Sequence, residues 1–468
     1  MSEILNIKLN KSSDIPIYRQ LGDAIRLLAQ DGFLSPSEKL PPIRTLAKAL
    51  NINNITVINA YKYLESKRVI YSITGSGTYV TDLPVNSSPI PAFSYNFIEK
   101  PDIVTDEAIN FAKSSASPDL FPVKEFQGFI NEVLERDKGY AFSYQDIAGY
   151  EPLREVICEH LLKYGIRTSA DRVQIINGAQ QGIDLISKAL LSHGDNLFAE
   201  KPTYYGAIGA FFSRGAQITE ISLEKDGINL GELEANLKIY KPKFIYVMTY
   251  FQTPTGISYS LEKKRALLAL AEKYNTYIIE EDDQGDFSYE DPPVVPLKAL
   301  DYKNRVIYIK SFSKIMMPGL RLGIMVLPKA IHQKIRDAKY ATDISSSGLT
   351  QRAFDLFLRS PLWSNRLAYM KTVFKARYSV LASALQKHLP PNAAYNLPGG
   401  GCSVWINLKE TNISDLCNKL LQRNVLVAPG AVYSLSGQEI PFIRISFAAA
   451  NEREIKTGVE ILGDELAK

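Results

Sequence analysis

A lysine that follows two closely spaced serines and precedes an arginine is the part of the chain best equipped for chemistry. Lys314 directly follows Ser313, Ser311 lies just before them, and Arg321 comes a short loop later. A lysine amine can form an imine with an aldehyde, while hydroxyl and guanidinium groups can donate hydrogen bonds to a phosphate dianion. Pyridoxal phosphate carries both an aldehyde and a phosphate. The cluster therefore predicts a pyridoxal phosphate site.

Three other motifs could contact such a cofactor. The run Asn177–Gly182 follows an expected strand and begins an expected helix, so its backbone amides would point at an anion that the helix dipole favours. Tyr204, in Pro202–Gly206, offers a ring that could stack on a pyridine, and Thr253 lies in the tight turn Phe251–Gly256. Each motif is weak by itself, because such a tyrosine is more often a core residue and such a glycine a plain helix start.

The elements that must position these residues form a regular pattern. Short apolar runs alternate with helical stretches from about residue 150 onward, which predicts a largely parallel sheet covered by helices, with a helix over 180–191. Ligands of such sheets bind at the carboxyl ends of the strands, where these motifs stand. The expected strands are 173–176, 196–199, 244–248, 277–279 and 306–309.

The first eighty residues show a different pattern. Apolar residues at helical spacing alternate with polar turns, and two strand-like segments follow around a glycine-rich turn. Two short helices around a tight turn, followed by a two-stranded ribbon, predict a winged helix-turn-helix. The expected elements are helices over 17–28, about 40–49 and about 56–67, and strands over 69–72 and 77–80.

Length and charge agree with this division. A chain of 468 residues with a hydrophobic fraction of 46% favours two or three compact units. Residues 1–80 contain ten basic and six acidic side chains, which leaves 44 of each kind for the remainder. The whole net charge of +4 therefore lies in the N-terminal segment, where it would attract a polyanion such as DNA.

Cysteine usage and the remaining segments point to a cytoplasmic protein. The three cysteines, Cys158, Cys402 and Cys417, lie far apart without metal-type spacing, which suits reduced structural residues. We expect no secretory signal and no membrane-spanning segment, because neither pattern occurs. Residues 81–107 contain four prolines and a run of small polar residues, which predicts a linker.

The N-terminal segment closely resembles the GntR type of winged-helix repressor. The matching motifs are Glu38–Pro41 before Arg44–Ala47, then Asn59–Leu64, then Gly75–Val80. The resemblance assigns residues 1–80 to a DNA-binding domain. Where the family usually has Ser-Arg before the recognition helix, this chain has Asn53-Asn54, which removes a charge but keeps groups that can bond to phosphate or adenine. By the resemblance, the DNA-contacting residues are Arg44, Asn54, Thr56 and Gly77.

Residues 108–468 resemble class I aminotransferases of fold type I, an α/β fold of pyridoxal-phosphate-dependent transferases. Together with the winged helix, this resemblance identifies the MocR subfamily of GntR regulators. It implies a large subdomain over about 150–335, a small one formed by 108–149 and 336–468, and a homodimer. It makes Lys314 the imine lysine, Tyr204 the stacking ring and Arg444 the clamp for an effector carboxylate. The implied phosphate contacts are Ala179, Gln180, Ser311, Arg321 and, from the partner subunit, Tyr144. Gly178 and Ser313 are further expected cofactor-binding residues.

Several positions depart from the catalytic pattern of that family. Thr253 stands where the family has an asparagine that bonds the cofactor's phenolate oxygen. An ungapped alignment to Phe287 places Glu281 where an aspartate should face the pyridine nitrogen, whereas a slip of one residue would place Asp282 there. The region of the usual tyrosine holds Asp283 or Gln284. Misplacing the carboxylate weakens carbanion stabilisation more than imine formation.

These departures favour sensing over catalytic turnover. We expect a transcription regulator whose aminotransferase-like domain binds pyridoxal phosphate and an amino compound as effector, and thereby shifts operator binding. One alternative is a working aminotransferase. The other is a regulator whose aminotransferase-like domain has lost the cofactor and only dimerises.

Overall fold

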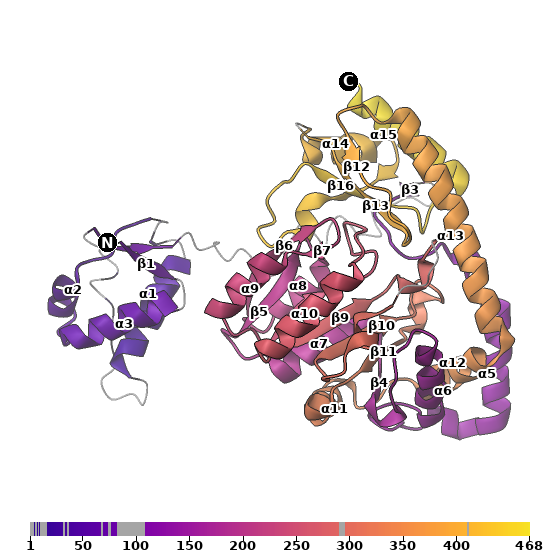
Figure 1. Cartoon of the computed structure of the whole chain (residues 1–468), viewed down its shortest axis with the longest axis horizontal. Helices are drawn as coiled ribbons and strands as arrows, with labels where there is room; N and C mark the ends of the chain where they lie inside the picture. Colours follow the sequence, from indigo (N-terminus) through magenta and orange to yellow (C-terminus); the bar gives the residue numbers. More distant parts are fainter. Residues whose placement is uncertain are drawn as a thin grey trace. The chain divides into compact units, whose positions relative to one another are not determined.

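The computed structural model describes residues 16–30, 33–34, 37–66, 69–73, 76–81, 108–289, 295–409 and 411–468, together with positions 4, 7 and 9. The chain divides into two compact units, residues 1–89 and 90–468 (Figure 1). The predicted linker 81–107 lies almost entirely outside the described residues. Each unit is described by itself.

The N-terminal unit is the predicted winged helix. Helix α3 begins at Asn54, two residues earlier than expected, because Asn53 caps it by accepting a hydrogen bond from the backbone N–H of Ile55 at 2.9 Å. The hydroxyl of Tyr61 on α3 donates to the carbonyl oxygen of Pro41 at 2.7 Å, which fixes the approach to α2. The elements are α1 (Ile17–Gln30), α2 (Ile43–Ala49), α3 (Asn54–Ser66) and the antiparallel hairpin of β1 (Ile70–Ile73) and β2 (Gly77–Val80).

The second unit is built on an eight-stranded mixed sheet in the order β4-β11-β10-β9-β8-β5-β6-β7 (Figure 1). Neighbouring strands from β10 through β6 run parallel, whereas β11 is antiparallel to both β10 and β4, and β7 is antiparallel to β6. All five strands expected from the sequence are present, and β6, β7 and β11 are additional. The strands are β4 (Val173–Ile176), β5 (Asn196–Lys201), β6 (Gln217–Glu224), β7 (Gly227–Ile228), β8 (Phe244–Val247), β9 (Tyr277–Asp282), β10 (Val306–Ser311) and β11 (Gly323–Val326).

Helices cover both faces of this sheet. One face packs Ile279, Ile309 and Met325 against α7 (Ala179–Leu190), α8 (Tyr205–Phe212) and α11 (Lys329–Asp343). The other face packs two further clusters against α6, α9, α10 and α12. The alternating strands and helices thus bury apolar residues on both sides of the sheet. The helices on the second face are α6 (Glu151–Leu162), α9 (Leu230–Ile239), α10 (Leu261–Lys273) and α12 (Gly348–Arg359).

A smaller sheet in the order β12-β13-β16-β15 forms the C-terminal part of this unit. Strand β3 (Ile109–Asn110) pairs in parallel with β14 (Val425–Leu426), so the segment that begins at residue 108 lies with C-terminal residues. The long helix α13 packs along α15 (Figure 1). The remaining elements are α5 (Val123–Asp137), α13 (Pro361–His388), α14 (Ile413–Gln422), α15 (Glu452–Leu466), β12 (Ala394–Tyr395), β13 (Ser403–Asn407), β15 (Ala428–Pro429) and β16 (Phe442–Ser446).

Two features are absent from the described residues. No helix among them is both long and apolar enough to cross a bilayer. The same residues contain no group of three or more His, Cys, Asp or Glu side chains placed to hold a metal ion. The three cysteines are unpaired.

Candidate functional site

Lys314 lies in the loop that follows β10, at the carboxyl end of the parallel strands. The side chain is buried, with 8% of its surface exposed, and its Nζ donates a hydrogen bond to Oδ2 of Asp283, just beyond β9. Strand register explains the pairing, because Lys310 on β10 stands opposite Asp282 on β9. Burial opposes the ammonium charge, but the carboxylate of Asp283 outweighs it and raises the pKa of Lys314.

The expected phosphate residues gather around the first turn of α7. Gly178 precedes the helix with φ +84°, and a Cβ at this position would clash with the guanidinium of Arg321. That guanidinium donates from Nη2 to the carbonyl oxygen of Asn177 at 3.0 Å. The hydroxyl of Ser311 accepts a hydrogen bond from the backbone N–H of Ser313 at 3.3 Å. The helix N-terminus, a cation and hydroxyl groups therefore form one anion-binding cradle.

Tyr204 and Gln180 lie beside this cradle. The side chain of Gln180 donates to the carbonyl oxygen of Gly206 at 2.8 Å, which joins the start of α7 to the start of α8. A Cβ on Gly206 would meet the ring of Tyr204 at 2.6 Å, so this half-buried ring stands next to the same turn. Ala179 is the first residue of α7 and is half-buried.

The two acidic residues considered for the pyridine nitrogen point to opposite faces of β9. Glu281 accepts a hydrogen bond from the hydroxyl of Tyr246, and its pKa is raised to about 8, mainly by burial and by the nearby charge of Asp283. Lys314 lowers that pKa, so Glu281 lies on the side of Lys314. Asp282 instead accepts from Tyr308 at 2.5 Å on the other face. Glu281, which the ungapped alignment places against the pyridine nitrogen, and Asp282, which the one-residue slip would place there, thus have different surroundings.

Gln284 and Thr253 connect the loops that surround Lys314. The side-chain amide of Gln284 donates to the hydroxyl oxygen of Thr253 at 3.1 Å and to the carbonyl oxygen of Phe251 at 3.1 Å. Its amide oxygen accepts from the backbone N–H of Cys402 at 3.0 Å. Gln284 therefore links three segments through hydrogen bonds. Because the Thr253 hydroxyl oxygen accepts from Gln284, the proton of that hydroxyl remains available for donation.

Arg444 on β16 brings a buried guanidinium into the same neighbourhood. Only 4% of the residue is exposed, Nη2 donates to the carbonyl oxygen of Ala112, and the guanidinium lies 5.5 Å from the ring centre of Tyr433. Its positive charge also lowers the pKa of Lys314. No acidic residue in the described part of the chain forms a salt bridge with Arg444. A buried guanidinium of this kind suits a ligand carboxylate.

Several buried polar atoms around this cluster have no hydrogen-bond partner among the described residues. Because an unpaired buried polar atom costs about 1–3 kcal/mol, such atoms in one place indicate a ligand site. Thr203 and Tyr433 are neighbours, because the backbone N–H of Thr203 donates to the carbonyl oxygen of Tyr433 at 3.1 Å. The atoms are Oγ1 of Thr203, Oδ1 of Asp283, the hydroxyl of Tyr433 and Nε of Arg444.

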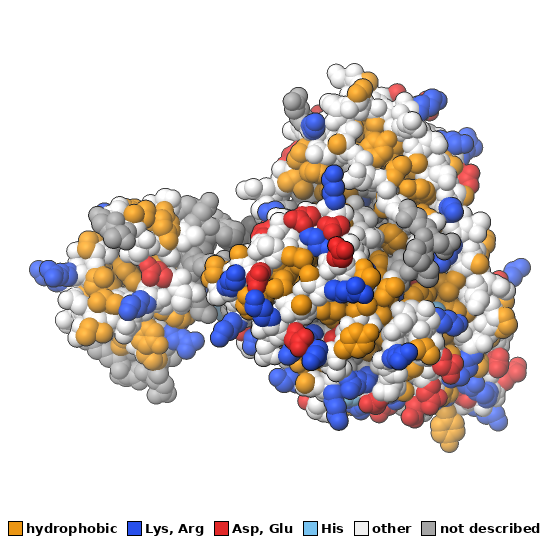
Figure 2. Space-filling view, in the orientation of Figure 1, with side chains coloured by type: hydrophobic (Ala, Val, Ile, Leu, Met, Phe, Trp, Pro, Cys, Tyr) orange, Lys and Arg blue, Asp and Glu red, His pale blue; other side chains and the backbone are white. Residues whose placement is uncertain are grey.

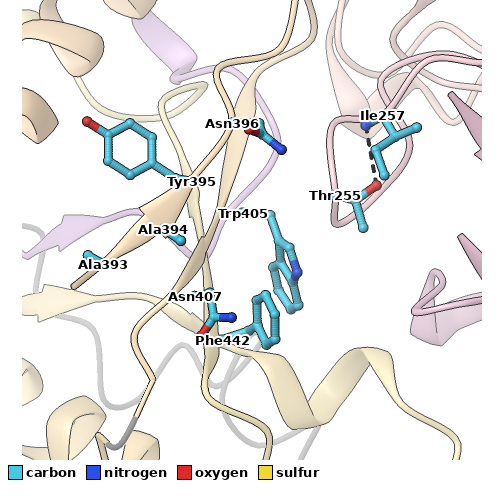
Figure 3. Close-up of a pocket in the computed structure, with 9 residues that line it drawn as sticks. All are labelled: Thr255, Ile257, Ala393, Ala394, Tyr395, Asn396, Trp405, Asn407 and Phe442. Carbon is cyan, nitrogen blue, oxygen red and sulfur yellow. Dashed lines mark hydrogen bonds between the residues drawn. The ribbon is translucent and has the colours of Figure 1, made fainter. Parts of the chain in front are cut away.

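A hollow of about 430 Å³ lies next to this cluster, between the small sheet and the loop that holds Thr255 and Ile257 (Figure 3). Trp405 stands opposite Arg444 in the sheet register. The centre of its ring lies 5.6 Å from that of Tyr433, edge to face, and 5.1 Å from that of Phe442, on which it stacks. Figure 3 shows the Trp405 and Phe442 rings next to each other, between the segment of Ala393–Tyr395 and the loop of Thr255 and Ile257. Trp405 therefore contacts both the Arg444 cluster and the hollow.

Tyr144 is not brought to the Lys314 cluster by its own chain. It is 82% exposed, as are its neighbours Tyr140 at 77% and Phe142 at 69%. Three exposed aromatic residues within five positions form a surface that a monomer would leave in water. We call residues 140–144 the aromatic loop.

The four expected DNA-contacting residues lie in the N-terminal unit. Arg44 on α2 and Asn54 on α3 are exposed, and Thr56 is half-buried. Gly77 begins β2 with φ +141°, and a Cβ there would meet Cε of Lys39 at 2.6 Å. Gly77 therefore allows the hairpin to pack against Lys39.

Sequence reasoning missed residues that the structure brings to the site. Asp283 was considered only as a stand-in for a tyrosine, not as the partner of Lys314, and Tyr433 and Lys310 were not considered. Register between the two predicted strands would have revealed Asp283, because residues just beyond paired positions share a sheet edge. No sequence signal marked Tyr433.

Comparison with known proteins defines the class of this site. The model of the aminotransferase class I and II family matches residues 118–462, so the chain belongs to that family. A kynurenine aminotransferase of Pyrococcus horikoshii, solved with PMP, is 29% identical, with a TM-score of 0.74 over 78% of this chain and 91% of that one. The α-aminoadipate aminotransferase LysN of Thermus thermophilus, solved with a phosphopyridoxyl-leucine, is 30% identical, with a TM-score of 0.73 over 81% of this chain and 97% of that one.

The N-terminal unit gives the narrower assignment. The model of the gntR family of bacterial regulatory proteins matches residues 17–80. An HTH-type transcriptional regulator of Bacillus subtilis, YdfD, is 30% identical over 97% of each chain. The protein is therefore a MocR-type transcriptional regulator, with a GntR winged helix in front of an aminotransferase-like domain.

Proposed function

We propose that this regulator binds pyridoxal phosphate at Lys314, responds to an amino compound bound beside Arg444, and thereby changes its affinity for operator DNA. The observation that carries the proposal is a buried lysine and an anion-binding cradle at one edge of the large sheet, together with a buried guanidinium that pairs with no carboxylate among the described residues. Each group alone has a structural explanation. Together they match a cofactor that carries an aldehyde and a phosphate, and a second ligand that carries a carboxylate.

The described residues fit pyridoxal phosphate. The amides at the start of α7, Ser311 and Arg321 would hold the phosphate, and Tyr204 would lie against the ring. Glu281 would face the ring nitrogen and Lys314 the aldehyde. Pyridoxal phosphate supplies an aldehyde that primary amines attack and a ring that withdraws electrons.

The acidic residues around Lys314 favour sensing over turnover. A carboxyl group with a pKa of about 8, such as that of Glu281, is mostly protonated at neutral pH. A neutral carboxyl is a poor partner for a protonated ring nitrogen, so electron withdrawal by the ring is weakened. Asp283 holds Lys314 as an ammonium ion and offers no phenolic proton. The site is thus suited to capturing amines and poorly suited to fast proton transfers.

The proposed effector is an amino compound with a carboxylate. Arg444 would hold the carboxylate in a bidentate contact, and the hydroxyl of Tyr433 would add a hydrogen bond. The hollow beside Trp405 lies next to these groups (Figure 3). Its volume of about 430 Å³ would accept a side chain of considerable size.

We further propose a homodimer that places Tyr144 in the partner's site. The aromatic loop supports this assembly, because its rings are exposed and Tyr144 reaches no phosphate residue of its own chain. Two winged helices would then bind paired half-sites on the operator.

The absorbance spectrum of the full chain with pyridoxal phosphate tests this proposal. We expect a near-visible imine band that requires Lys314 and is absent in Lys314→Ala. Borohydride should abolish this band by reducing the imine to an amine, and the cofactor should then stay attached to the chain through dialysis. The matched control is Lys303→Met, which removes a lysine of the same unit from an exposed ion pair with Glu272. Absence of the band from the native chain would favour a cofactor-free dimerisation domain. Rapid turnover of an amino acid with a keto acid would favour the working aminotransferase, whose fold and lysine this chain retains.

A further inference from the structure

The outward face of α3 presents an apolar side chain without a packing role. Ile55 is 62% exposed, although it lies in the first turn of a helix whose inner face is well packed. The buried residues of that helix are Val57, Ala60, Tyr61 and Leu64, at the spacing of one helix face. Ile55 therefore points away from the core of the N-terminal unit.

The neighbours of Ile55 on this face are amides rather than cations. Asn54 and Asn59 are exposed, and their side chains form no hydrogen bond with the described part of the chain. Asn59 stands one helical turn beyond Ile55, so the two side chains are adjacent. Asn53 differs, because its side chain caps the helix and is occupied. The first cation on this face is Lys62, slightly more than two turns from the start of α3.

Cations suited to the DNA backbone lie elsewhere in the same unit. Arg44 and Lys48 are exposed on α2, and Lys39 lies against the hairpin, with its Nζ 5.9 Å from the ring centre of Tyr79. Figure 2 shows lysine and arginine side chains spread over the visible face of the unit. Phosphate contacts position a protein on DNA but do not read sequence. The first two turns of α3 carry no cation that could make such a contact.

We propose that Asn54, Ile55 and Asn59 read A·T pairs in the major groove, an inference that rests on the proposed DNA-binding function. Guanine offers two acceptors and is usually read by arginine or lysine, neither of which stands in this stretch. In the major groove adenine presents one acceptor and one donor, which an asparagine amide can bind with its own donor and acceptor. Thymine presents a methyl group, which an isoleucine side chain can contact. The geometry thus assigns amide contacts to adenine and an apolar contact to thymine.

Selection from a random duplex library with the full chain, followed by single base replacements, tests the inference. We expect the selected half-sites to contain A·T pairs at their core. Replacing a contacted thymine by uracil removes only the methyl group and should weaken binding about fourfold, the equivalent of one buried methylene. Ile55→Ala should weaken binding to the thymine duplex by a similar factor and abolish the thymine-to-uracil difference. Asn54→Ala should weaken binding to the A·T half-site about five- to hundredfold.

Ile239→Ala is the matched control, because Ile239 is 70% exposed on the other unit and should leave the thymine-to-uracil difference unchanged. Thermal unfolding of Ile55→Ala should closely match that of the native chain, since most of the Ile55 surface is exposed. Equal binding of thymine and uracil duplexes by the native chain would overturn the inference, as would selected cores rich in G·C. If the chain retained no duplex, both the inference and the proposed DNA-binding function would fail.

Discussion

The contact between Lys314 and Asp283 controls how readily the lysine gives up its proton. Because Asp283 raises the pKa of Lys314, Asp283→Asn should lower that pKa and increase the fraction of free amine at neutral pH. Pyridoxal phosphate should then attach faster at pH 7, by up to about tenfold for each pKa unit removed. Stopped-flow absorbance across pH would measure the rate. An unchanged pH profile would show that Asp283 does not set the lysine's protonation.

Glu200 is a second buried carboxyl whose protonation affects the fold. Burial raises its pKa from 4.5 to about 7, although Tyr259 and Gln252 donate hydrogen bonds that partly offset the effect. The folded state therefore holds a proton that the unfolded state releases. The protonated Glu200 stabilises the folded state by roughly 3 kcal/mol relative to the ionised form. This contribution is fully present below pH 4.5 and is lost as pH rises through about 7.

Glu200→Gln should remove this dependence. Urea unfolding of the native chain between pH 5 and 8, in the absence of cofactor, should show stability falling with pH, and the variant should show a flatter profile. Glu220→Gln is a suitable control, because that carboxylate lies on neighbouring β6 in a surface ion pair with Lys201. Parallel profiles for the native chain and Glu200→Gln would contradict the assignment.

Strands β9 and β10 are joined beneath the site by a buried ionic network. Lys310 is 1% exposed and forms salt bridges with Asp282 at 3.2 Å and Asp286 at 2.7 Å. Removing the cation leaves two buried carboxylates without their partner, so Lys310→Met should destabilise the second unit by about 3–5 kcal/mol. Lys303→Met, which removes an exposed ion pair, should cost less than about 1 kcal/mol. Denaturant titration measures both, and similar losses would contradict the role of Lys310.

Most elements of the fold could be predicted from the sequence, because their apolar runs are short and well bounded. Strands β4 and β10 are fully buried, and their runs of isoleucine and valine are visible in the sequence. Strand β11 was missed because it follows Arg321 almost directly and has no turn signal of its own. Its antiparallel direction depends on the close approach of Gly323 to Gly178, which is a tertiary contact.

The candidate site was only partly predictable. Lys314 and Arg321 have local motifs, whereas Arg444 came from a family resemblance. The choice between Glu281 and Asp282 depends on strand alternation at one position, and a local sequence cannot fix that phase without the neighbouring strands. In the structure, the strand phase is visible from the hydrogen bonds that Glu281 accepts from Tyr246 and Asp282 accepts from Tyr308.

At the scale of the whole molecule, the aromatic loop predicts assembly. Light scattering should give the mass of a dimer, about twice 52.3 kDa. Tyr144→Ala should weaken pyridoxal phosphate binding several-fold, because it would remove a phosphate hydrogen bond supplied by the partner subunit. Tyr302→Ala is the matched control, since Tyr302 is 87% exposed and distant in sequence from the aromatic loop. Equal effects of the two substitutions would argue against a shared site.

The central claim is that cofactor and effector binding at Lys314 and Arg444 change the affinity for DNA. The most direct test measures binding of the full chain to a selected duplex with and without pyridoxal phosphate and a panel of amino acids, for the native chain, Lys314→Ala and Arg444→Met. The account predicts a five- to hundredfold shift, on the order typical of allosteric coupling, that depends on both residues. Identical DNA affinity under all conditions, or a shift that persists without Lys314, would contradict it.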